Sequence, residues 1–189
     1  MGMGPIVCVV MGVVVHASSA SASASGLGIT GVDISDGGAH VLAETLTDSG
    51  YLAYRTSLFS LLDVPVSASA LEIHKQISEC FPATRLMQLS EDGVAAAVER
   101  DLVIPLRTLK TRIERDLSLT IDESDRLFRI AHVHALADAV FGEPAKAKRW
   151  LSKSKERFGG LAPMHLLTTQ HGANMVEDML LRISLGLAF

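Results

Sequence analysis

The sequence predicts an all-α protein, and three observations support this fold class. Hydrophobic residues make up 48% of the 189 residues and charged residues 20%, which is enough for one or two small globular domains. Aromatic residues make up only 5%, and the apolar positions are mostly Leu, Ala and Val, a composition that favours helices. From residue 41 onwards, apolar residues also recur at the spacing of amphipathic helices.

Residues 1–40 differ from the rest of the chain, and we expect a disordered or unselected N-terminal extension here. Residues 6–15 form an apolar run, IVCVVMGVVV, which is shorter than the roughly 20 residues that span a bilayer. A Ser/Ala tract follows, as it would after a secretion signal, but no Lys or Arg precedes Arg55. A secretion signal and an extension both remain open, and N-terminal sequencing of the native protein separates them.

Residues 41–142 are predicted to form a helical domain. The expected helices cover 41–62, with an interruption at Gly50, then 70–79, a segment opened by Pro82 and closed by Gly93, and 95–101. Thr120 and Glu123 match a capping box, which predicts a long helix that starts there and runs to about Phe141. Because apolar residues cover a broad surface of this helix, we expect it to be central and packed on more than one side.

A helix-turn-helix is predicted around residues 102–116, LVIPLRTLKTRIERD. Pro105 suits the first position of a helix, and Leu106, Leu109 and Ile113 form a predicted buried stripe. A short helix, a tight turn and a basic amphipathic helix are the layout in which the second helix enters the DNA major groove. The candidate DNA contacts are Arg107, Thr108, Lys110, Thr111 and Arg112. On these residues alone, a solvated basic face is the favoured interpretation and DNA contact is the alternative.

Residues 143–189 are predicted to form a second small helical domain. A basic amphipathic helix runs from Pro144 to about Ser152 and carries the only tryptophan, and a Gly-Gly turn and a proline-initiated short helix follow it. We expect the tryptophan to pack inside and orient the last helix, which is predicted from about Gln170 to Leu185, with Gly186 as its cap. The expected supporting residues are Trp150, Gly159, Gly160 and Pro163.

Charge is unevenly distributed along the chain. The net charge is −4, yet residues 98–158 carry 13 Lys/Arg against 10 Asp/Glu, which is a net charge of +3. Residues 144–158 alone hold six Lys/Arg and one Glu, so this stretch is either a solvated face or a surface for a partner or for phosphate. Cys8 and Cys80 lie in unrelated contexts, which predicts two free thiols in a reducing compartment.

No motif in the sequence assembles a catalytic site. There is no HExxH, no Gly-rich phosphate loop, no CxxC and no distinctive Ser/His/Asp spacing. His132 and His134 are two positions apart and therefore do not share a helix face, so no metal site is predicted there. We accordingly expect a protein that is not an enzyme and uses no cofactor or metal.

Four segments of the C-terminal half resemble a known family in order and spacing. They are ESDRLFRIAHVHALADAVFG (123–142), AKAKRWL (145–151), FGGLAPMHLLTTQHG (158–172) and VEDMLLRISLGL (176–187). Over residues 102–189 the chain resembles the Xre/MbcA/ParS antitoxins of bacterial toxin–antitoxin pairs. From about Val41 it also resembles the N-terminal part of the Xre members that pair with RES-domain toxins.

The resemblance implies a cytoplasmic antitoxin with two activities and no membrane association. It would neutralise a RES-type toxin that degrades NAD by obstructing the toxin active site, and it would bind promoter DNA to repress its own type II operon. A homodimer within a larger toxin–antitoxin complex is implied as well. The alternative is a stand-alone helix-turn-helix transcription regulator whose C-terminal domain only oligomerises.

The last helix and the apolar tail are the predicted blocking element, because an inhibitor by occlusion needs a rigid platform and a few large anchors. The candidate toxin contacts are Glu177, Leu181, Arg182, Leu185, Leu187 and Phe189. The tail itself either packs back on the core or docks on a partner, and the sequence leaves both interpretations open.

Overall fold

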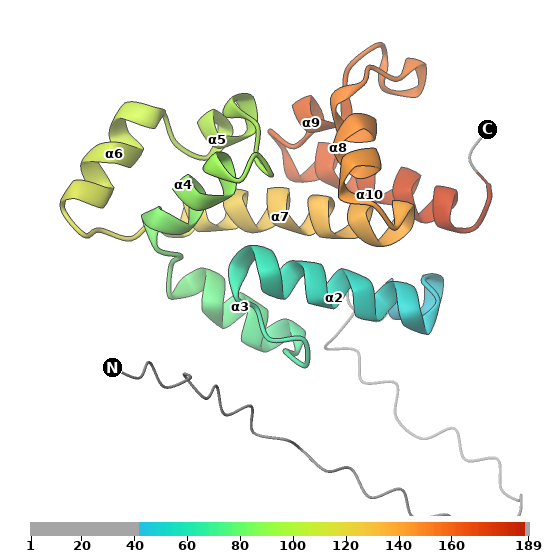
Figure 1. Cartoon of the computed structure of the whole chain (residues 1–189), viewed down its shortest axis with the longest axis horizontal. Coiled ribbons are helices and arrows are strands. Elements are labelled where there is room, and N and C mark those ends of the chain that lie inside the picture. Colours follow the sequence, from blue (N-terminus) through green and yellow to red (C-terminus); the bar gives the residue numbers. More distant parts are fainter. Residues whose placement is uncertain (1–41, 188–189) are drawn as a thin grey trace, which may run out of the picture. The chain divides into compact units, whose positions relative to one another are not determined.

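The computed structural model describes residues 42–187, and within them every regular element is a helix (Figure 1). The predicted all-α fold class is therefore confirmed. The expectations for residues 1–40 and for Phe189 lie outside the described residues. Among residues 42–187, no helix combines the length and the apolar character that crossing a bilayer requires.

Helix α7 (Ile121–Phe141) is the centre of the fold, as its broad apolar surface predicted. Its start is the predicted capping box: the Glu123 N–H donates to Thr120 Oγ1 at 3.3 Å, and the Thr120 N–H donates to Glu123 Oε2 at 2.7 Å. Helices α2, α3, α5, α8 and α10 all pack against it. Its fully buried apolar side chains point in several directions: Leu127, Ile130, Ala131, Val133 and Leu136.

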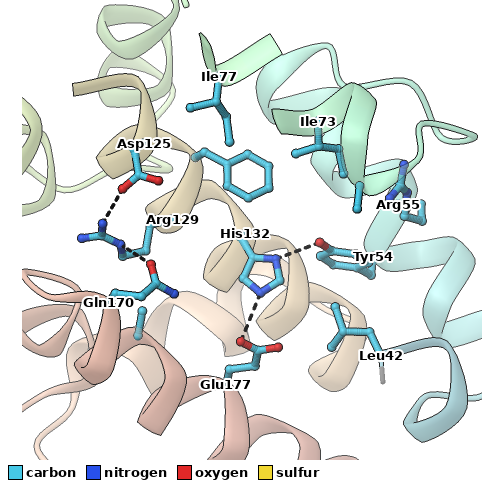
Figure 2. Close-up of a pocket in the computed structure, with 13 residues that line it drawn as sticks. Leu42, Tyr54, Arg55, Ile73, Ile77, Asp125, Arg129, His132, Gln170 and Glu177 are labelled. Carbon is cyan, nitrogen blue, oxygen red and sulfur yellow. Dashed lines mark hydrogen bonds and ion pairs between the residues drawn. The ribbon is translucent and has the colours of Figure 1, made fainter. Parts of the chain in front are cut away.

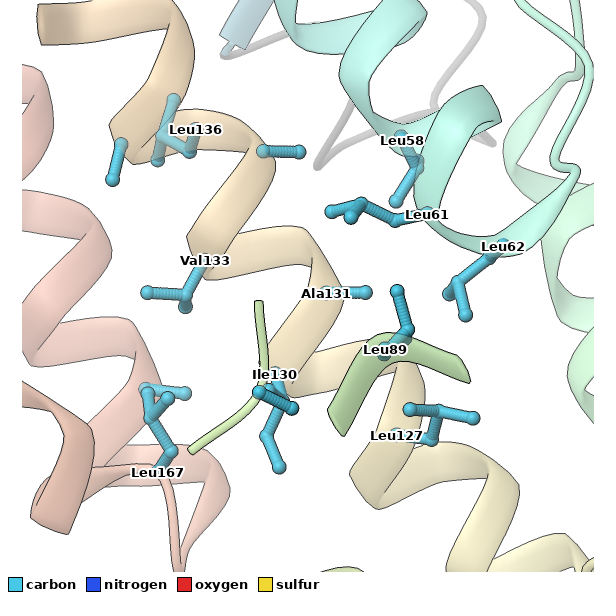
Figure 3. Packing of buried hydrophobic residues seen from close by; sticks show 14 of the residues in the cluster. Leu58, Leu61, Leu62, Leu89, Leu127, Ile130, Ala131, Val133, Leu136 and Leu167 are labelled. Atoms are coloured by element: carbon cyan, nitrogen blue, oxygen red, sulfur yellow. The ribbon is translucent and has the colours of Figure 1, made fainter. Parts of the chain in front are cut away.

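Helix α2 (Asp48–Leu62) packs along one side of α7, next to α3 (Ala70–Ser78) (Figure 1). Figure 3 shows Leu58 and Leu61 of α2 facing α7 across the core. The predicted interruption at Gly50 is wrong by three residues, because the break falls at Thr47. The Thr47 hydroxyl accepts the Gly50 N–H at 3.1 Å and caps α2, so Gly50 lies inside the first turn of the helix.

Arg55 holds the turn between α2 and α3. The residue is 2% exposed, and its guanidinium donates to the carbonyl oxygens of Pro65, Val66 and Ala68 at 2.8, 3.0 and 2.7 Å. A buried charge is tolerated only where hydrogen bonds replace its hydration, and three carbonyls supply them here. The turn that precedes α3 is therefore fixed from the inside.

Helices α4 (Ala83–Glu91), α5 (Ala97–Val103) and α6 (Leu106–Glu114) follow in sequence (Figure 1). Gly93 lies just beyond the end of α4, as predicted. Pro82 opens α4, as predicted, whereas Pro105 was predicted at the first helical position and stands one residue before it. Both have ψ near 138°, at 137° and 139°, so each is the extended cap before its helix and not the first helical residue.

The C-terminal part contains α8 (Pro144–Ser152), a 3₁₀ turn (Glu156–Phe158), α9 (Pro163–Leu166) and α10 (Gln170–Ser184). Two prolines occupy the first turn of α8 and of α9, as predicted. The end of α10 is a Schellman motif, in which the Leu187 N–H donates to the Arg182 carbonyl and the Gly186 N–H to the Ile183 carbonyl. One continuous hydrophobic core extends from α2 to α10.

Candidate functional site

Helix α6 presents a basic face beyond the body of the protein. Leu109 is fully buried and Ile113 packs against the core, so the stripe that anchors α6 on α4 is the predicted one. Arg107, Thr108 and Lys110 are exposed on the remaining surface. Within residues 42–187, neither of these two cations has an ion-pair partner. The geometry thus leaves them available to a phosphate or a base edge.

Arg112 has a different environment from the other predicted DNA contacts. It forms a two-pronged ion pair with Glu123, with Nη1 2.8 Å from Oε2 and Nη2 3.0 Å from Oε1. Its Nη1 also donates to the Ser118 carbonyl at 3.0 Å. Both side chains of the pair are mostly buried. Arg112 therefore links α6 to the start of α7. Thr111, another predicted DNA contact, uses its hydroxyl within α6, where it donates to the Arg107 carbonyl.

The outer end of α10 carries most of the predicted toxin contacts. Val176 and Leu180 anchor α10 in the core and are fully buried. Arg182, Leu185 and Leu187 are exposed at its C-terminal end, and Arg182 pairs with Asp178 one turn earlier, with 2.9 Å between Nε and Oδ2. Leu181 is half-buried against the core. The arrangement is a charged pair bordered by apolar side chains.

Glu177 points away from this exposed end and into a cleft of about 310 Å³ between α2, α3, α7 and α10. Figure 2 shows His132 of α7 between Glu177 and Tyr54 of α2. His132 Nδ1 lies 2.8 Å from the Tyr54 hydroxyl, and His132 Nε2 lies 3.6 Å from Glu177 Oε2. Burial raises the pKa of the Tyr54 phenol far above its usual range, so the phenol stays protonated. Its O–H can therefore donate a hydrogen bond to His132 Nδ1. The three side chains join α2, α7 and α10.

A second link fixes the N-terminal end of α10. Arg129 of α7 pairs with Asp125 and donates from Nε to Gln170 Oε1 at 3.0 Å (Figure 2). Gly172 permits a close approach, because a Cβ at that position would lie 2.1 Å from the Leu166 carbonyl oxygen of α9. The presentation of α10 thus depends on α2, α7 and α9, and the sequence patterns identified none of these side-chain links.

Trp150 is half-buried, and its ring lies against Phe141 at the end of α7, with 5.7 Å between the ring centroids. The Lys155 ammonium lies 5.1 Å from the indole centroid. Gly159 and Gly160 have φ of 65° and 84°, a left-handed turn that brings the Gly160 N–H onto the Lys155 carbonyl at 2.9 Å. The turn therefore holds Lys155 over the tryptophan.

Pro163 is buried where α9 begins, and α9 packs on both α8 and α10. Of the predicted supporting residues, the structure thus places Trp150, Gly159 and Gly160 around Lys155, and it places Pro163 next to the last helix. Across residues 42–187, no three His, Cys, Asp or Glu side chains are grouped so that they could hold a metal ion.

Comparison with known proteins identifies relatives of the C-terminal part and of most of the chain. A family model described as the antitoxin Xre/MbcA/ParS C-terminal toxin-binding domain matches residues 136–186. A protein named antitoxin Xre from Pseudomonas putida is 62% identical over 146 residues, which are 77% of this chain and 92% of the relative. Another antitoxin Xre, from Yersinia enterocolitica serotype O:8, is 35% identical over 92 residues, which are 48% of this chain and 62% of that protein.

Proposed function

This chain belongs to the Xre/MbcA/ParS-type antitoxins, and on that basis we propose that its toxin partner is a RES-domain enzyme that degrades NAD. The antitoxin binds this enzyme and obstructs access to its active site. It does so in the cytoplasm, as a homodimer within a larger toxin–antitoxin complex. The resemblance of residues 41–142 to RES-paired members motivates the choice of toxin.

The observation that carries the proposal is the exposed end of α10. Arg182, Leu185 and Leu187 project from a helix whose inner face is fully buried and whose C-terminus is closed by a Schellman motif. An inhibitor by occlusion needs a preorganised element, because a flexible one would lose binding free energy when it became ordered. Central anchors of this kind each contribute about 2 kcal/mol or more to a protein interface.

The direct test is an NAD-consumption assay with the purified toxin encoded beside this chain. Addition of the antitoxin at equal concentration should stop NAD loss, and the two proteins should elute together in size-exclusion chromatography. If the proteins elute together but NAD loss continues, occlusion of the active site is wrong. If the neighbouring reading frame encodes no RES domain and no toxin co-purifies, the stand-alone transcription regulator becomes the better description.

A second activity, repression of its own operon, is supported by the exposed face of α6. Arg107 and Lys110 have no ion-pair partner among residues 42–187, and α5, a two-residue turn and α6 have the layout of a helix-turn-helix. In a homodimer, two copies of α6 would read two half-sites of the promoter. Binding to a promoter fragment, compared with binding to shuffled DNA of equal length, tests this activity.

A further inference from the structure

A shallow pocket of about 310 Å³ lies beside α8, and none of its lining residues belongs to α6 or α10. Two aromatic side chains form its floor and four cationic side chains its rim: Phe141, Trp150, Lys146, Arg149, Lys153 and Lys155. The two rings are tilted by 43° to each other, and the surface that lines the pocket is mainly apolar. We call this feature the α8 pocket.

The positive charge of the α8 pocket is mostly uncompensated. Lys146 pairs with Glu143 at 3.0 Å, and Lys155 lies over the tryptophan ring. Arg149 and Lys153 are exposed and have no ion-pair partner anywhere in residues 42–187. These two cations therefore have no carboxylate partner of their own within the described residues, and their charge can attract an anionic partner.

The loop that carries Lys155 is held by its backbone. The Lys155 carbonyl accepts the N–H groups of Phe158 and Gly160 at 3.0 and 2.9 Å, and the Lys155 N–H donates to the Leu161 carbonyl at 3.0 Å. Burial, with a contribution from Lys153, lowers the pKa of the Lys155 ammonium. The backbone of this loop thus holds the Lys155 ammonium at the rim, although burial and the nearby Lys153 both disfavour its charged form.

We propose that the α8 pocket binds an acidic segment of the toxin, with an apolar side chain on the aromatic floor and carboxylates on Arg149 and Lys153. This inference rests on the proposed toxin binding. Charge complementarity favours an anionic partner for the free cations, and the aromatic side chains favour an apolar side chain beside the negative charge. A DNA backbone supplies phosphates but no projecting apolar side chain.

The position of the pocket also favours the toxin over DNA. Helix α8 packs on α7 and α9, whereas α6 packs on α4, so the two basic surfaces belong to different parts of the fold. The residues that form the pocket lie at 141–155, inside the stretch that matches the toxin-binding domain model. The α8 pocket is therefore a second toxin contact, additional to the end of α10.

The single tryptophan makes the pocket directly observable. When 5-fluorotryptophan is incorporated into this chain alone, the protein gives one fluorine resonance, and unlabelled toxin contributes none. We expect the chemical shift of this resonance to change with toxin and to stay the same with duplex promoter DNA, whereas slower tumbling broadens the line in either complex. A resonance that toxin leaves unchanged, or that promoter DNA shifts in its place, overturns the assignment.

Charge reversal measures the contribution of the rim. Arg149→Glu and Lys153→Glu should each weaken toxin binding about tenfold at low salt, which corresponds to about 1.4 kcal/mol, and should flatten its salt dependence. Lys75→Glu changes the net charge equally at an exposed site on α3 and should leave the affinity unchanged. If toxin binds wild type and both rim variants with equal affinity and salt dependence, the α8 pocket inference is wrong while toxin binding stands. If wild type fails to bind toxin, the proposed function fails first.

Discussion

Glu99 and His134 meet inside the core, where His134 Nε2 lies 2.8 Å from Glu99 Oε1. Glu99 is 1% exposed and His134 5%. The second oxygen of Glu99 accepts the Ala96 N–H at 2.8 Å, where α5 begins. This pair therefore fixes α5, the first helix of the proposed helix-turn-helix, onto α7, the helix in which the match to the toxin-binding domain model begins.

Removal of this link should destabilise the whole fold. Glu99→Ala would leave the buried His134 imidazole and the partly buried Ala96 N–H without a partner, which costs about 3 kcal/mol. Denaturant unfolding followed by circular dichroism measures the loss. Glu79→Ala, at an exposed position on α3, is the control and should change stability by less than about 0.5 kcal/mol. Equal stability of the two variants would show that the buried pair contributes nothing.

The exposed end of α10 yields a prediction for neutralisation. Arg182→Glu and Leu185→Asp should each abolish protection against the toxin in a co-expression growth assay, because they place new charge at the proposed contact without touching the core. Lys75→Glu and Leu71→Asp make the same chemical changes at exposed positions on α3 and should protect fully. Unchanged melting temperatures show that the variants are folded, and full protection by both α10 variants would rule out this contact.

The basic residues of α6 should differ in their roles: Arg107 and Lys110 should contact DNA phosphates, whereas Arg112 should stabilise the fold. Arg107→Ala and Lys110→Ala should weaken promoter binding and lower the slope of log affinity against log salt by about 1 each, because each lost phosphate contact releases one counterion fewer. Fluorescence anisotropy at several salt concentrations gives the slope. An unchanged slope would exclude the substituted residue from phosphate contact.

Arg112→Ala should behave differently from its neighbours on α6. It leaves the mostly buried Glu123 carboxylate without its guanidinium partner, so we expect a loss of about 1–3 kcal/mol in unfolding free energy. Denaturant unfolding measures this loss. A variant with wild-type stability and a reduced salt slope would place Arg112 among the DNA contacts after all.

Asp138 predicts a pH dependence. Burial raises the pKa of this carboxyl above its ordinary value, and the Ser57 hydroxyl, which donates to Oδ2 at 3.0 Å, only partly opposes the effect. The native state therefore holds the proton more tightly than the unfolded state. The stability that this proton contributes is lost as pH rises from the pKa of Asp138 in the unfolded state to its higher pKa in the native state. Above both pKa values the loss is complete.

Asp138→Asn should consequently stabilise the protein at neutral pH, by about 0.5 kcal/mol or less because solvent screens a half-exposed group. The gain should disappear below the ordinary pKa of an aspartate. Thermal melting at acidic and neutral pH measures the difference, with the exposed Asp92→Asn as the control. A gain of the same size at both pH values would contradict the burial argument.

Local signals were readable from the sequence because caps act within one turn of a helix. The capping box at Thr120 and the prolines at 144 and 163 predicted where α7, α8 and α9 begin. The spacing of the two histidines also predicted correctly that they face different ways: His132 lies against Tyr54 and His134 against Glu99. The break predicted at Gly50 was wrong, because a glycine alone does not show that the Thr47 hydroxyl three residues earlier caps the next helix.

The links between helices were not readable, because they join residues far apart in the sequence. Tyr54 and His132 are separated by 78 positions, and Glu99 and His134 by 35. No periodicity encodes such a pair, since each member alone is compatible with an exposed polar position. The same holds for Arg112: its basic character predicted DNA contact, and no pattern revealed that it pairs with Glu123 of the following helix.

The central position of α7 determines where the chain can be divided. The match to the toxin-binding domain begins at residue 136, more than halfway along a helix that starts at Ile121. A fragment cut there would lose the Thr120 cap, the Arg129 link to α10 and the His132 bridge to Glu177. Recombinant toxin-binding fragments should therefore begin before Thr120, so that α10 keeps the helix on which it is mounted.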